Sequence, residues 1–158
     1  MKRDRDRLAA RALADLERPV EALARIAGDR TPEADVLRAE INWKIENWAA
    51  AAQALGRLAG EPPSGDAALP DEQASRVLRY AAALALARDQ SGLDGVRSKF
   101  GPAMTKGPFK DIFPVIASDA AGTMADVRDI AARLPSTAPF QTFLGAYRER
   151  FSGPATRS

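Results

Sequence analysis

The stretch Leu37-Arg-Ala-Glu-Ile-Asn-Trp-Lys-Ile-Glu-Asn-Trp-Ala-Ala-Ala-Ala-Gln-Ala-Leu55 decides the fold class of this chain. Its apolar spacing predicts two helices joined by a tight turn at residues 45–47, with the second helix running over residues 48–58. Alanine has the highest helix propensity, and its small side chain lets two helices approach closely. Because a helical hairpin cannot bury both of its apolar faces alone, we expect it to stack on neighbouring hairpins. The apolar side chains of the first helix are Val36, Ile41 and Ile45.

Helical patterns continue on both sides of this hairpin. Thr31 is the expected N-cap of the helix that leads into it, and residues 60–66, rich in Gly and Pro, predict an exposed loop. No segment predicts a strand, and the pattern indicates about nine helices in an all-α fold. Further helices are expected at residues 4–16, 20–27 with Gly28 as C-cap, 69–89, 93–100 stopped by Gly101-Pro102, 126–134 and 139–151, and an apolar face at Phe109, Ile112, Phe113 and Ile116.

The composition fits one helical domain. The chain has 158 residues, of which 46% are hydrophobic and 6% aromatic, so its core is expected to consist mostly of Ala and Leu. This favours closely packed helices over a β-sandwich, whose strands prefer Val, Ile, Thr and aromatic residues. We expect a single domain at residues 1–151 and a frayed tail at residues 152–158.

Several chemistries are excluded by residue type. The chain has no Cys and no His, which removes disulfides, thiolate zinc sites, Cys nucleophiles and Ser-His pairs. The segment from Gly101 to Gly107 has Lys before Gly and so does not match a phosphate loop. Acidic pairs such as Glu17 with Glu21 and Asp126 with Asp129 have the spacing of solvated helix faces. We therefore expect no catalytic residues, no metal, no cofactor and no enzymatic activity.

The charge pattern bears on partners and location. The formal net charge is +2, and acidic and basic residues alternate, as in residues 1–7. A nucleic-acid partner is therefore not expected, because such proteins more often show a one-sided excess of Lys and Arg. No apolar run approaches the length of a membrane span, and no apolar segment follows the basic N-terminus as in a secretory signal. The simplest expectation is a cytoplasmic protein, unless the sequence belongs to a longer one.

Residues 12–26 align with residues 41–55 as a weak internal repeat. The alignment pairs Leu16 with Ile45, Glu17 with Glu46, Ala22 with Ala51 and Ile26 with Leu55. The chain thereby resembles the tetratricopeptide-repeat family, over about the first 60 residues. In that family small residues twelve positions apart meet between the two helices of a hairpin. The matching residues are Ala10 with Ala22, Ala39 with Ala51, the aromatic Trp48, the apolar Leu55 and the closing Pro63.

This chain also departs from the family pattern. Both family glycines are missing, with Ala10 and Ala39 at one position and Glu17 and Glu46 at the other. The first repeat is shorter than the family length, and the third hairpin matches only loosely. The part from residue 78 to residue 147 resembles the C-terminal segment of long, uncharacterised tetratricopeptide-like proteins of alphaproteobacteria.

The resemblance implies a right-handed α-solenoid of about four helical hairpins plus a C-terminal capping helix. In the family, the first helix of each hairpin lines a concave groove that binds a peptide. Trp43 has two interpretations, a groove anchor flanked by cations or a core residue covered by Arg and Lys stems. The groove residues implied by the family register are Arg7, Arg11, Val36, Glu40, Trp43, Lys44, Arg76, Arg79 and Tyr80.

Two functions follow as hypotheses. The first is a non-enzymatic scaffold or adaptor that binds a protein or peptide partner, with an acidic partner favoured by the groove cations. The second is a structural terminal segment of a longer helical-repeat protein, with no ligand of its own. The aromatic face of residues 140–151 either caps the solenoid or docks a partner or a second copy. The sequence leaves the identity of the partner and the oligomeric state open.

Overall fold

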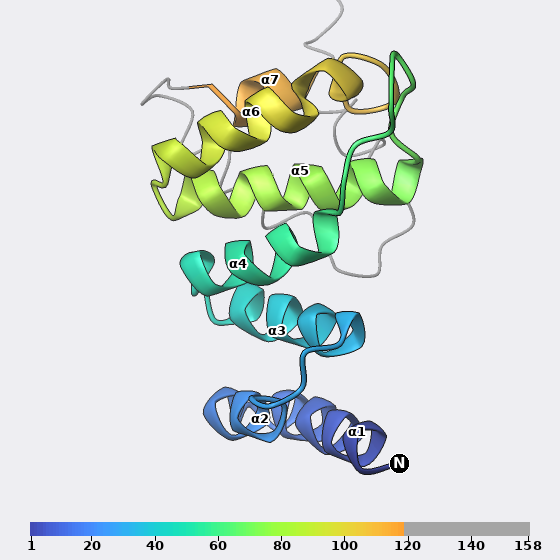
Figure 1. The fold of residues 1–158 in the computed structure, drawn as a ribbon. Coiled ribbons are helices and arrows are strands. Elements are labelled where there is room, and N and C mark those ends of the chain that lie inside the picture. Colours follow the sequence, from blue (N-terminus) through green and yellow to red (C-terminus); the bar gives the residue numbers. More distant parts are fainter. Residues whose placement is uncertain (119–158) are drawn as a thin grey trace, which may run out of the picture.

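A computed structural model describes residues 1–118, and this part of the chain is all-α, with seven helices and no strand. Figure 1 shows α3, α4 and α5 stacked one above another, with α1 and α2 side by side at one end of the stack and α6 and α7 at the other. No helix among residues 1–118 is long and apolar enough to cross a membrane. The helices are α1 (Lys2–Asp15), α2 (Pro19–Arg25), α3 (Pro32–Lys44), α4 (Trp48–Ala59), α5 (Asp71–Leu86), α6 (Gln90–Met104) and α7 (Phe113–Ile116).

Three tight turns of one geometry form three helical hairpins, α1–α2, α3–α4 and α5–α6. Each turn places one non-glycine residue in the left-handed region, with φ of 58° at Glu17, 59° at Glu46 and 58° at Arg88. In each turn the next residue's N–H reaches back five residues, which satisfies a carbonyl at the helix end. The three bonds are Arg18 N to Leu13 O at 2.9 Å, Asn47 N to Asn42 O at 2.8 Å and Asp89 N to Leu84 O at 2.9 Å.

These turns agree with the internal alignment of the sequence. Glu17 and Glu46, aligned from sequence alone, adopt the same backbone conformation, and Arg88 adds a third equivalent position. The predicted turn at residues 45–47 is confirmed. In Figure 1 the three turns lie along one edge of the stack.

In two of the hairpins the second helix, α4 or α6, begins with a side-chain N-cap. The Asp89 carboxylate accepts a hydrogen bond from Gly92 N at 2.8 Å, and the Asn47 side chain accepts one from Ala50 N at 3.4 Å. Such caps satisfy an N–H that has no partner inside the helix. Thr31 occupies the predicted N-cap position of α3, but its hydroxyl donates to the Asp29 carboxylate at 2.8 Å and caps nothing.

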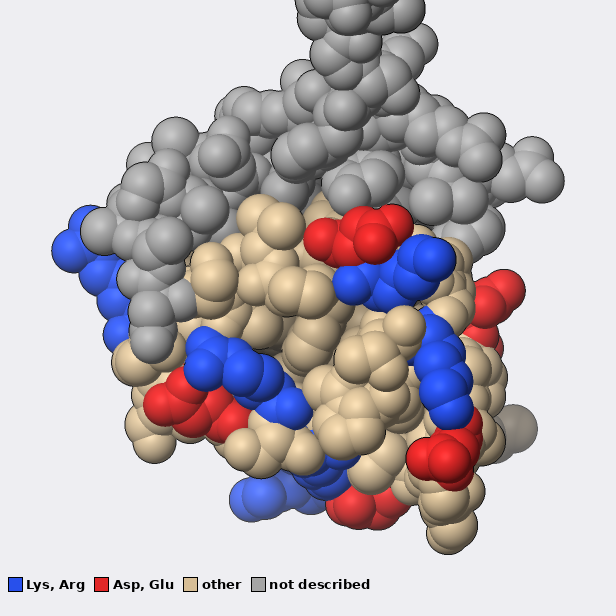
Figure 2. Space-filling view, turned by 90° about the horizontal axis from the view of Figure 1, so that it is seen from above, with Lys and Arg blue, Asp and Glu red and all other residues tan. Residues whose placement is uncertain are grey.

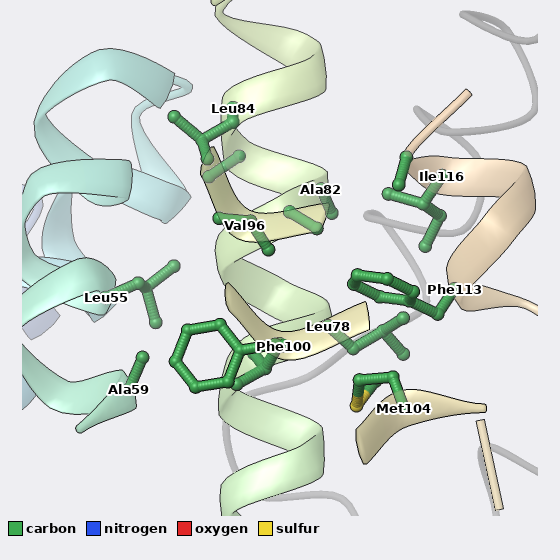
Figure 3. Close-up of a cluster of buried hydrophobic side chains, with 14 of the residues drawn as sticks. Leu55, Ala59, Leu78, Ala82, Leu84, Val96, Phe100, Met104, Phe113 and Ile116 are labelled. Carbon is green, nitrogen blue, oxygen red and sulfur yellow. The ribbon is translucent and has the colours of Figure 1, made fainter. Parts of the chain in front are cut away.

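The larger hydrophobic core lies between α4, α5, α6 and α7. Figure 3 shows Leu55 of α4 and Leu78 of α5 pointing into it, with Phe100 of α6 and Phe113 of α7. Phe100 and Leu78 are at most 2% exposed. Small residues on α5, among them Ala82 at 0% exposed, let the neighbouring helices approach it closely. The predicted apolar face is confirmed as buried at Phe109, Ile112, Phe113 and Ile116.

A smaller apolar cluster joins the first hairpin to α3. Its buried members are Ala10, Ala22, Ile26, Ala34, Leu37 and Ile41. The alanines expected at close helix crossings, Ala10 with Ala22 and Ala39 with Ala51, are all at most 2% exposed. This cluster is separate from the larger core and is shared between the first hairpin and α3.

A buried carboxylate ties α3 to its neighbours. Asp35 of α3 accepts two hydrogen bonds from Arg57 of α4, at 2.9 Å from Nε and 2.8 Å from Nη2, and one from Arg38 Nη1 at 2.9 Å. Arg38 also donates to the carbonyls of Ile26 and Asp29 at the end of the first hairpin. This network therefore connects α2, α3 and α4 through charged hydrogen bonds.

Some expected boundaries were wrong. The helix predicted at residues 93–100 is α6, which begins at Gln90 and continues through Gly101-Pro102 to Met104. Proline is tolerated there because Pro102 is itself exposed and removes only one hydrogen bond in the last turn. Helix α2 ends at Arg25 with Ile26 as C-cap, so Gly28 is not the C-cap.

Three apolar residues of the predicted helix faces are exposed. Leu8 is 70% exposed, Leu16 68% and Ile45 43%. Leu16 and Ile45 are C-cap residues at the hairpin turns, and the part of α1 that meets other helices is centred on the buried Ala10.

The predicted helices at residues 126–134 and 139–151, the aromatic face and the tail lie outside the described residues.

Candidate functional site

Helices α1, α3 and α5 bring four of the predicted groove residues together. Arg11 of α1 pairs with Glu40 of α3, the closest nitrogen and oxygen being 3.9 Å apart. Trp43 lies one turn after Glu40 on the same face of α3. The guanidinium carbon of Arg79 on α5 lies 4.7 Å from the centre of the Trp43 ring. Side chains from the first helix of all three hairpins thus form one continuous row.

Trp43 belongs partly to the core and partly to this row. It is partly buried and packs against the larger core cluster. Its ring meets that of Trp48 edge to face, with centroids 5.2 Å apart and planes at 87°. The guanidinium of Arg79 lies over the ring within cation–π distance. The alternatives of core residue and groove anchor are therefore not exclusive.

Arg79 carries a positive charge in a largely dry environment. Its Nε and Nη2 atoms are buried and have no hydrogen-bond partner among the described residues. Burial lowers the pKa of the guanidinium below its ordinary value, and the negative charge of Glu40 opposes this shift. Because arginine stays protonated even after a large decrease, the group remains a cation with two unsatisfied donors.

A surface hollow of about 370 Å³ lies between α1 and α3, next to the Arg11–Glu40 pair. It combines two leucine side chains with charges of both signs, which is a surface suited to an amphipathic peptide. The sequence prediction missed Leu8 and Leu37, although Leu8 lies one turn from Arg11. The residues that line the hollow are Asp4, Arg7, Leu8, Arg11, Glu33 and Leu37.

Two predicted groove residues make contacts that hold the helices together. Arg7 donates to the Thr31 hydroxyl at 2.8 Å and pairs with Asp4, so it fixes α1 to the loop before α3. Tyr80 lies in the interface between α4 and α5, because a Cβ added to Gly56 would stand 3.0 Å from its ring.

No hydrogen bond, ion pair or ring contact within residues 1–118 joins the remaining three predicted residues to the row. Arg76 pairs with Glu72 of its own helix, Val36 is partly buried and Lys44 is exposed.

Charges of both signs lie side by side on one face of the described part of the chain. Figure 2 shows Lys and Arg side chains beside Asp and Glu side chains on the face seen from above. Within residues 1–118 no group of three or more acidic residues is placed to hold a metal ion.

Comparison of the chain with protein families, with curated proteins and with solved structures finds no match.

Proposed function

We propose that this chain is a non-enzymatic protein-interaction module, a scaffold or adaptor that binds a peptide or helix of a partner protein across α1, α3 and α5. One observation carries the proposal: the row formed by Arg11, Glu40, Trp43 and Arg79. Tryptophan and arginine are the residues most often found at the energetic centre of protein interfaces. The hollow between α1 and α3 extends this row and adds apolar surface.

We also propose that the three hairpins are successive units of a right-handed, tetratricopeptide-like solenoid. The support is the repeated turn geometry at Glu17, Glu46 and Arg88, and the buried alanines at the expected helix crossings. Stacked hairpins present their first helices on one side, and such surfaces bind extended partners.

The test is a selection of peptides from a random displayed library with the full chain as bait. Selected peptides are then titrated against the wild type and two single charge reversals on α1. Arg11→Glu changes the proposed row, whereas Arg5→Glu makes the same change on another face of the helix. We expect Arg11→Glu to weaken binding about tenfold and Arg5→Glu to have little effect. Failure to enrich any peptide over an unrelated bait would refute the proposal.

A second candidate is a structural segment of a longer helical array with no ligand of its own. The exposed apolar residues of the first hairpin favour it, since Leu8, Leu16 and Val20 are 70%, 68% and 78% exposed. Such a surface can pack against a further helix. An unsuccessful peptide selection, together with further helical hairpins encoded upstream, would support this candidate over the adaptor.

A further inference from the structure

The unsatisfied atoms of Arg79 form one particular edge of its guanidinium. Nε and Nη2 lie side by side, and their N–H bonds point in nearly parallel directions. This is the edge that holds both oxygens of a carboxylate at once. Both nitrogens are buried without a partner among the described residues. A buried donor without an acceptor destabilises a protein, so this arrangement requires an explanation.

Two other arginines of the chain show what the same edge does when it is occupied. Arg57 uses Nε and Nη2 to bind the two oxygens of Asp35, at 2.9 and 2.8 Å. Arg18 binds Glu21 in the same way, with both distances 2.7 Å. Arg79 thus presents the same donor pair without the carboxylate.

We propose that an acidic side chain of the partner peptide binds to the Nε–Nη2 edge of Arg79, beside the Trp43 ring. The proposal rests on the proposed function, because it names the chemical group that the same row recognises. A carboxylate matches the edge in shape and supplies the missing negative charge. The guanidinium carbon lies 4.7 Å from the centre of the Trp43 ring, so a carboxylate bound to this edge would lie beside Trp43.

Glu40 does not already fill this role. It pairs with Arg11 at 3.9 Å, a distance too long for a hydrogen bond, and its charge only partly offsets the burial of Arg79. The Arg11 side chain is 62% exposed, so the Arg11–Glu40 pair can turn aside at little cost. Because both nitrogens are buried, neighbouring side chains have to move before a peptide carboxylate can reach them, and such side-chain changes are common at interfaces.

The test is a double-mutant cycle with a selected peptide. In the peptide, each Glu or Asp is replaced in turn by Gln or Asn. In the protein, Arg79→Met removes the donor edge, and Arg25→Met on the exposed side of α2 is the matched control. We expect one peptide change and Arg79→Met each to weaken binding by about tenfold or more, and the two together to cause no further loss.

A stability measurement separates a binding role of Arg79 from a structural one. Arg79→Met removes two unsatisfied buried donors, so its urea midpoint should equal or exceed that of the wild type while peptide binding is lost. If Arg79→Met does not fold, Arg79→Lys keeps the charge without the two-nitrogen edge and should also weaken binding several-fold.

The outcomes distinguish this inference from the proposed function. If selected peptides bind Arg79→Met and Arg79→Lys as tightly as the wild type, or do not depend on an acidic residue, this inference is wrong and the adaptor function stands. If no peptide is selected, both are overturned. If the peptide substitution and Arg79→Met each weaken binding but their effects add up in the double mutant, the peptide carboxylate binds elsewhere on the row and the inference is also overturned.

Discussion

Asp35→Asn should destabilise the fold strongly, although the substitution barely changes the shape of the side chain. Asp35 is 5% exposed and accepts three charged hydrogen bonds from Arg57 and Arg38. Removing one member of a buried ion pair costs about 3–5 kcal/mol. Arg57 is 53% exposed and can return to water, which reduces the loss to about 2–3 kcal/mol. Total stabilities are about 5–15 kcal/mol, so this is a large fraction.

Urea unfolding followed by helical circular dichroism measures this loss. With a slope of about 2 kcal/mol per M, the midpoint should fall by about 1–1.5 M. Asp94→Asn is the matched control, because Asp94 pairs with Arg97 at 3.1 Å with both side chains about half exposed. That change should alter stability by at most about 0.5 kcal/mol. An Asp35→Asn protein as stable as the control variant would refute this account of the network.

The same network predicts how stability depends on pH. Hydrogen bonds from Arg57, helped by Arg38, hold the pKa of Asp35 below its ordinary value despite its burial. Below about pH 4 the unfolded chain binds a proton that the folded chain does not, so the contribution of Asp35 is full above that pH and decreases below it. The difference in urea midpoint between wild type and Asp35→Asn should therefore be largest at neutral pH and become smaller from pH 4 to pH 3. A difference that grows on acidification would contradict the assignment.

Three further predictions concern turns, caps and core. Arg88→Gly should stabilise the protein by about 0.5–1 kcal/mol, because Arg88 has a φ of 58° and glycine adopts this conformation without strain. Ala12→Gly within α1 should destabilise it by about 1 kcal/mol, so the melting temperatures of the two variants should move in opposite directions in thermal unfolding. Asp89→Ala should lower the free energy of unfolding by about 1 kcal/mol and Asn47→Ala by less, because the capping hydrogen bond of α6 is 2.8 Å long and that of α4 is 3.4 Å. Equal losses in urea unfolding would show that the length of the capping hydrogen bond does not matter. Phe100→Ala should cost about 3–5 kcal/mol because the ring is 2% exposed, and a midpoint within 0.5 M of wild type would contradict the description of the core.

Local sequence chemistry was sufficient to predict the hairpins. The turn at residues 45–47 follows from propensity and spacing, which act within one or two helical turns, whereas the alanines at the helix crossings were expected from the family resemblance. The extension of α6 through Pro102 was missed because a proline in the last turn removes only one hydrogen bond. The exposure of Leu8 was missed because periodicity indicates which face is apolar, but not how much of that face another helix covers.

The candidate site was predictable only in part, since it depends on distant residues. The family register named Arg11, Glu40, Trp43 and Arg79, and the structure joins Arg11 to Glu40 and Arg79 to Trp43. It could not show that Arg7 is engaged by the loop before α3, because that loop comes 24 residues later in the sequence. The empty donor edge of Arg79 has no signature in the sequence, because it reflects an acceptor that the surrounding helices do not supply.

Intrinsic tryptophan fluorescence tests the central claim most directly. The chain has two tryptophans: Trp43 is part of the proposed binding row, and the ring of Trp48 meets it edge to face. Fluorescence therefore reports on this site alone. A selected peptide should change the emission in a saturable manner, with the same Kd that calorimetry gives. Binding detected by calorimetry with no change in emission would place the peptide elsewhere and contradict the account.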